Sequence, residues 1–215
     1  MKEKNKKEKK HKMDISFEPP PLPSAEDKLF QSGDDWWHNA CLNYMHDGWP
    51  AYVIGYKKAA DILVTYIKKE RRSQDTLVFP ILFLYRQYLE LSIKNLIQKG
   101  RQLQDISEPT PGGHRIHDLW KVCEKLLNEI APGDSTAEIK QINRLILEFC
   151  AVDPRGTAFR YPEDNNGNPS LPDITHINIR NVYDVIEKIS VILEGADMQI
   201  SEYLSFKDEM RREYL

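Results

Sequence analysis

A row of ionisable residues lies inside the most apolar stretch of this chain. Arg86, Glu90 and Lys94 are spaced four residues apart within the run from Phe83 to Lys94. At 3.6 residues per turn they share one face of a helix, beside an apolar stripe. The row is either an i,i+4 ladder of ion pairs or the lining of a cleft, and the sequence leaves both interpretations open.

Two histidines are candidates for acid–base chemistry. Metal-independent cleavage of RNA by its 2′-hydroxyl needs a group that titrates near neutral pH and a cation that stabilises the phosphorane. His114 or His117 could supply the first and Arg86 the second, with Glu90 as a further catalytic candidate. Asp118 either orients a histidine or caps the following helix, in which case His114 bonds a loop carbonyl.

The segment from Arg155 to Asp164 is the strongest binding candidate. Loop arginines and aromatic residues beside a glycine suit recognition of phosphate or of a base. The structural alternative is that Arg160 forms an ion pair with Asp164 or Glu90 and fixes the loop to the fold. The candidate ligand-binding residues are Lys94, Asp118, Arg155, Arg160, Tyr161 and Asp164.

Neither a metal site nor a cofactor is predicted. Cys41, Cys123 and Cys150 lie far apart with no C-x-x-C, which is typical of buried thiols in a reducing cytoplasm. His114-x-x-His117 lacks the further ligands that zinc needs. The glycine-rich phosphate loops and the common hydrolase motifs are absent from the sequence.

Hydrophobic periodicity predicts an all-α fold, a bundle of four or five helices. The expected helices cover about 51–71, 74–99, 118–130, 134–149 and 179–204. Pro80 either starts or kinks the second helix, and Gly100 ends it. Extended segments at 157–162 and 173–177 predict a small β-hairpin or loop insertion near 155–178.

Two of these apolar stripes need each other and predict the core. The residues expected to be buried together are Leu82, Tyr85, Leu89, Ile93, Ile186, Ile189 and Leu193. Because charges on a central helix must find partners, Arg86 and Glu90 should be shielded. Their partners should come from the loop after Gly113 or from residues 155–164.

Charge and composition divide the chain into three parts. Residues 1–23 form a disordered arm, rich in lysine and then in proline, and its lysines either keep the protein soluble or contact nucleic acid. Residues 24–204 form the helical domain, and 205–215 a charged extension. No apolar run suits a signal peptide or a membrane span, so we expect a cytoplasmic protein with no membrane partner.

A short aromatic helix is expected over residues 35–47, after two aspartates and before Gly48. Its Trp36 and Trp37, together with Trp49, should cover one end of the core. The same helix is the candidate surface for a protein partner.

Three motifs carry a resemblance to a known family. They are the run Tyr85–Lys94, the pair Gly113-His114 and His117-Asp118-Leu119-Trp120, and Phe159-Arg160-Tyr161-Pro162-Glu163-Asp164 before a long final helix. Over about residues 50–204 the chain resembles HEPN-like helical proteins of bacteria, many of them uncharacterised or linked to defence.

The resemblance implies a helical bundle that often forms a homodimer. In many members it also implies a metal-independent ribonuclease assembled across the dimer, with an arginine four to six residues before a histidine on a late helix. This chain lacks that motif: Arg155, Arg160 and Arg180 have no histidine at that spacing, and Arg115 is too close to His117. Whether the chain is an enzyme is therefore open.

The function expected from the sequence is binding, of RNA, a nucleotide or a partner protein, in a bacterial antiviral defence or toxin–antitoxin setting. The alternatives are a ribonuclease with an atypical site and a structural adaptor. Outside its basic arm the chain is acidic, so any contact with RNA should be local.

Overall fold

The computed structural model describes residues 21–42, 48–133 and 136–213. The chain divides into two units, of which the first ends at Tyr44 and the second begins at Met45. All the α-helices of the described residues belong to the second unit.

The first unit contains a single helical turn among its described residues, the 3-10 helix η1 (Trp36–His38). Trp36 and Trp37 are 76% and 92% exposed. That these two rings cover the core stays a prediction. The prediction of a helix over 35–47 is wrong for the described part of that segment, and 43–47 lie outside the described residues.

Local hydrogen bonds explain why η1 stays short. Asn39 and Gly33 exchange two hydrogen bonds, at 2.7 and 2.9 Å, and Asp35 accepts one from the backbone of Trp37. These local hydrogen bonds satisfy backbone groups of the segment that would otherwise be paired in a longer helix. The first α-helix among the described residues starts at Trp49. Most of the predicted arm lies outside the described residues, and its disorder stays a prediction.

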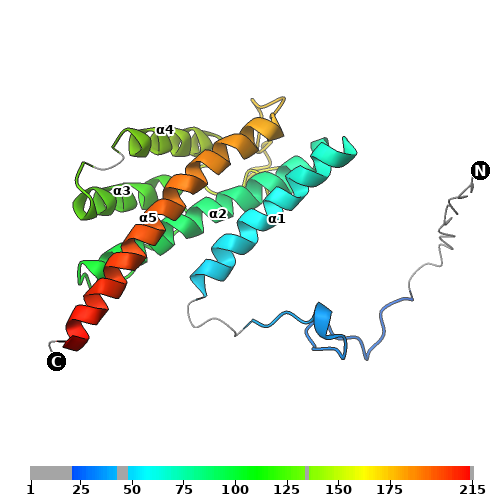
Figure 1. Cartoon of the computed structure of the whole chain (residues 1–215). Helices are drawn as coiled ribbons and strands as arrows, with labels where there is room; N and C mark the ends of the chain where they lie inside the picture. The colour runs from blue at the N-terminus through cyan, green and yellow to red at the C-terminus, as the bar shows by residue number, and fades with distance from the viewer. Residues whose placement is uncertain (1–20, 43–47, 134–135, 214–215) are drawn as a thin grey trace, which may run out of the picture. The chain divides into compact units, whose positions relative to one another are not determined.

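The second unit is a bundle of five helices, which confirms the predicted all-α class (Figure 1). The helices are α1 (Trp49–Glu70), α2 (Gln74–Leu103), α3 (Ile116–Ile130), α4 (Thr136–Val152) and α5 (Ile179–Glu213). No β-strand occurs in the ranges that the structure describes. Within these same ranges, no helix has both the length and the apolar character to span a membrane.

Helix α2 is the centre of the bundle, because it packs against α1, α3 and α5, while α4 packs mainly on α3. The seven residues predicted to form the core are all buried, with exposures of 0–4%. Pro80 lies inside α2, which begins at Gln74. Gly100 does not end α2: it is buried, and an added Cβ would lie 3.3 Å from Ile130 Cδ1. That glycine lets α2 approach α3 closely.

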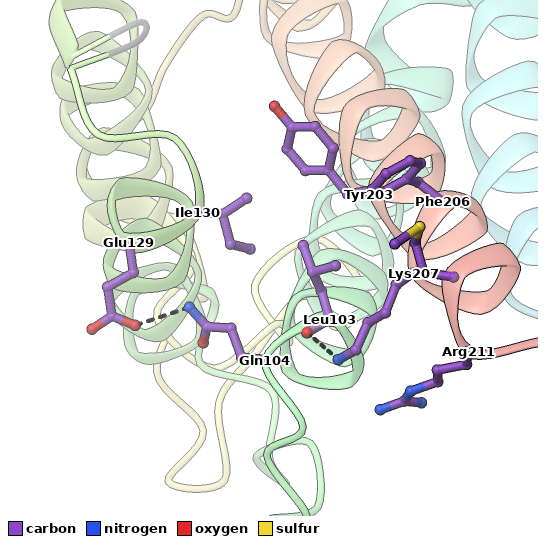
Figure 2. A pocket seen from close by; sticks show the side chains of 9 residues that line it. Leu103, Gln104, Glu129, Ile130, Tyr203, Phe206, Lys207 and Arg211 are labelled. Carbon is purple, nitrogen blue, oxygen red and sulfur yellow. Dashed lines mark hydrogen bonds between the residues drawn. The ribbon is translucent and has the colours of Figure 1, made fainter. Parts of the chain in front are cut away.

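The predicted C-terminal extension, residues 205–215, is mostly a continuation of α5 (Figure 2). Lys207 donates to the carbonyl of Leu103 at the end of α2 and forms an ion pair of 2.8 Å with Asp105. Arg211 lies 2.7 Å from the same carboxylate. Leu103, Lys207 and Arg211 border a pocket of about 650 Å³ at this end of the bundle. The charges thus join α5 to the end of α2.

The connection between α4 and α5 is a loop and not a hairpin. One isolated bridge, Glu163 with Pro169, is its only β-type pairing in the described chain. The predicted extended segment at 157–162 is a turn instead. The reason is Asp153, whose Oδ1 accepts from the backbone N–H groups of Thr157 and Ala158 at 2.8 and 3.1 Å.

Candidate functional site

A buried network of charges surrounds Arg86 where α2 meets two loops. Its guanidinium donates to Glu90 Oε2 at 3.2 Å and to the carbonyl oxygen of His114 at 2.5 Å, and its Nε lies 3.4 Å from Asp153 Oδ2. Arg86 and Glu90 are only 4% and 1% exposed. This confirms the prediction that both are shielded and pair with the loop after Gly113. The row on α2 is therefore an i,i+4 ladder, as one of the two interpretations predicted, but it is shielded and not on the surface.

Glu90 receives two further donors through its other oxygen. Lys94 Nζ and His114 Nδ1 each lie 2.8 Å from Glu90 Oε1. Burial by itself would raise the pKa of Glu90, but the hydrogen bonds from Lys94 and His114 outweigh it and hold the pKa below its ordinary value. Glu90 is thus a carboxylate at neutral pH. It orients its partners and cannot serve there as a proton donor.

The ring of His114 is largely exposed to solvent, while its Nδ1 is hydrogen-bonded to Glu90. Since an ionised carboxylate only accepts hydrogen bonds, the proton of a neutral ring lies on Nδ1, beside Glu90. Nε2 is then a free acceptor on a side chain that is 75% exposed. The alternative in which His114 bonds a loop carbonyl is wrong, since its ring meets Glu90 and its own carbonyl accepts from Arg86.

Asp153 and Gly156 complete the network from the far side. Asp153 is 2% exposed and links Arg86 to the turn after α4. Gly156 has φ +76°, and a Cβ there would fall 2.5 Å from Arg86 Cζ. Asp153 is not among the residues predicted for the site. Its signal was an acid just after the last residue of a helix, where the helix dipole disfavours negative charge and a specific cation is needed.

Arg160 and Tyr161 lie on the loop that this network anchors. The Arg160 guanidinium stands 5.0 Å from the ring centre of Tyr161 and 6.0 Å from that of Phe83, which is one turn before Arg86 on α2. Among the described residues Arg160 forms no ion pair with Asp164 or Glu90, so the structural alternative proposed for it is wrong. Tyr161 is 54% exposed. The pair is an accessible cation stacked on an aromatic ring.

Asp164 closes the tip of the same loop. Its Oδ1 accepts from the backbone N–H groups of Asn168 and Asn166, at 2.9 and 2.8 Å. These hydrogen bonds hold the pKa of Asp164 below its ordinary value, and the nearby charge of Arg155 adds to them. The turn accounts for Asp164 without a ligand, whereas Arg155 is exposed beside Gly156.

Asp118 does not cap α3. The N-cap is Arg115, and Asp118 lies in the first turn, 3.9 Å from Arg115 and 59% exposed. An acid there is favourable because of the helix dipole. Lys94 is 14% exposed and is engaged by Glu90, so it is not an open ligand donor.

The side chain of His117 is half-buried, and its backbone forms a hydrogen bond with Cys150. Burial raises the pKa of the Cys150 thiol, and a hydrogen bond with the backbone of His117 opposes that rise. Of the three predicted buried thiols, Cys123 is buried and Cys150 half-buried. Cys41 is exposed, so the prediction is wrong for that residue.

The structure therefore brings together Arg86, Glu90, Lys94 and His114, with Arg155 and Arg160 on the neighbouring loop. Within the described ranges, no group of three or more His, Cys, Asp or Glu side chains could hold a metal ion.

Comparisons with known proteins found no matching family model, no matching curated protein and no matching solved structure.

Proposed function

We propose that this chain is a HEPN-like helical protein that binds single-stranded RNA at a face formed by His114, Arg155, Arg160 and Tyr161. The observation that carries the proposal is that one buried guanidinium, Arg86, contacts both loops that bear these residues. The face is thus held in place by buried side chains of this chain itself. The bacterial defence setting rests on the family resemblance alone.

Each exposed group of this face suits one part of a nucleotide. Tyr161 with the Arg160 guanidinium over it offers a planar surface on which a base can stack. Arg155 supplies donors and a positive charge for phosphate, and the free Nε2 acceptor of His114 suits a 2′-hydroxyl, which can donate to it. The buried part holds two cations and two carboxylates, so the attraction comes from the exposed groups.

Binding of this kind is local and only moderately dependent on salt. A few phosphate contacts from the face give a shallow dependence of affinity on salt, in contrast to a protein with a broad basic surface. The same exposed groups would also accept a free nucleotide, and a nucleotide that competes with RNA would define the smallest ligand.

Fluorescence anisotropy with a labelled single-stranded RNA tests the proposal. Loss of the stacking platform in Tyr161→Ala should weaken binding about tenfold, because stacking of a base on an aromatic ring contributes roughly 1–3 kcal/mol. The control is Arg211→Ala, which removes an exposed charge near the end of α5. Its partner Asp105 follows the last residue of α2, Leu103, and Leu103 is 17 residues, or about 25 Å of helix, from Arg86. Equal affinities for the two variants would contradict the proposal.

A second candidate function is a ribonuclease with an atypical site, and the contact between Glu90 and His114 favours it. A histidine held at Nδ1 by a carboxylate, with Nε2 open to solvent, is the arrangement of a general base. Incubation of RNA with the protein in a metal chelator separates the two functions. Ends with 2′,3′-cyclic phosphate that vanish in His114→Gln would establish cleavage, and intact RNA would leave binding alone.

A further inference from the structure

An apolar pocket of about 460 Å³ lies between α4 and α5, separate from the face proposed for RNA. Leu82 and Leu89 of α2 and the segment 173–178 are among the residues that line it. The remaining side chains around it are Leu145, Ile146, Glu148, Phe149, Val152, Phe159, Asn181, Val182, Val185, Ile186 and Ile189.

Core side chains form the walls of this pocket. Leu89, Ile146, Ile186 and Ile189 are 1–3% exposed, and Phe159 packs edge to face against Phe149. Helix α4 packs mainly on α3 and leaves this space on its side toward α5. Apolar atoms that face such a space lack dispersion partners, which an apolar ligand of suitable size would supply.

The ionisable residues of the pocket are acidic or histidine. They are Glu148, Asp173 and His176, and no lysine or arginine is among the lining residues. Glu148 forms an ion pair with Arg144, 3.4 Å away, whereas Asp173 forms no ion pair within the described chain. An anionic ligand would thus meet an uncompensated carboxylate, and a cationic one would be attracted to it.

We propose that this pocket binds a small apolar molecule that carries a single cationic group, of the alkylammonium class. The apolar body lies between α4 and α5, and the cation lies at Asp173. This site is independent of the function proposed above, because it shares no residue with the RNA face.

The test is displacement of the neutral dye Nile red from the full chain, followed by fluorescence. Decyltrimethylammonium should displace the dye, and decanoate of equal chain length should need at least about ten times the concentration. In Asp173→Asn the two competitors should become more alike, since the charge that distinguishes them is gone. Decanoate that competes as well as the ammonium compound in the native protein would overturn the ligand class.

The location is tested by filling the pocket. Val185→Phe adds a ring to its wall and should reduce dye binding at least tenfold, while Val191→Phe adds the same ring to a residue of α5 that is 71% exposed and should change little. Circular dichroism shows whether both variants remain helical. If Val185→Phe does not fold, Val152→Phe fills the pocket from α4. Unchanged binding in the folded filled variant would refute the site.

Discussion

Two clusters of ion pairs join distant parts of this chain, one at Arg86 and one at Asp105. In the first, the side chains of Arg86, Glu90 and Asp153 are 4%, 1% and 2% exposed. In the second, Lys207, Arg211 and Asp105 are 21%, 56% and 62% exposed. Both clusters consist of ion pairs with a carboxylate, but water competes for the charged groups only in the second cluster. A buried charge without its partner is costly, so the Arg86 cluster specifies a geometry, whereas the Asp105 cluster merely favours one.

The largest effect should come from neutralising Glu90. Glu90→Gln leaves Arg86 and Lys94 beside one charge fewer in a buried site, and breaking a buried pair costs roughly 3–5 kcal/mol of unfolding free energy. Urea denaturation followed by circular dichroism measures this. The control Glu129→Gln, whose carboxylate is 45% exposed and 3.8 Å from Lys125, should change stability by less than about 0.5 kcal/mol. Equal effects would show that the cluster is not a structural centre.

A pair of glycines tests the fit around the guanidinium. Both Gly156 and Gly167 have positive φ, +76° and +80°, so alanine costs about 1–2 kcal/mol of backbone strain at either position. At Gly167 nothing lies within 4 Å of the added Cβ, whereas at Gly156 it meets Arg86. Thermal unfolding should therefore show a larger loss for Gly156→Ala. Matching losses would mean that Arg86 moves aside freely.

Acid should weaken the fold partly through Glu90. Its pKa in the folded protein lies below the ordinary value of 4.5, so its contribution to stability is present above that pH and is lost as the pH falls through the folded pKa. Urea midpoints between pH 6 and pH 3 should fall more steeply for the native chain than for Glu90→Gln. Parallel curves would contradict a charged Glu90 in the fold.

The smallest effect should come from the exposed cluster. Hydrogen bonds from Lys207 and then Arg211 lower the pKa of Asp105, yet all three groups remain in contact with water. Arg211→Ala should lower the melting temperature slightly at low salt and hardly at all in 1 M salt, where the Debye length is about 3 Å. A large loss that persists in salt would place this cluster on a par with the Arg86 cluster.

Local spacing made one half of this comparison predictable. The four-residue period of Arg86, Glu90 and Lys94 located the charged row, and the apolar density around it required shielded partners. The partner His114 lies next to a glycine-rich loop and was a candidate. Asp153 was not a candidate, because it lies 67 positions after its partner Arg86. The periodicity of a helix gives no information about contacts at that separation.

The errors share a cause in tertiary and local contacts. Gly100 is a stop signal in isolation, but here it is a packing position against α3. The charged residues after 204 resemble an extension in the sequence because their partners, such as Asp105, are remote along the chain. The aromatic residues around Trp36 and Trp37 predict a helix over 35–47. Hydrogen bonds between Gly33 and Asn39 instead limit the described part of that segment to one 3-10 turn.

Hydrogen–deuterium exchange with and without saturating single-stranded RNA tests most directly the central claim, that Arg86 holds two loops together as one binding face. The account predicts slower exchange in residues 112–118 and 153–162 together, with no change at the end of α5 around Arg211. Protection confined to one of these loops, or found only elsewhere in the chain, would contradict it.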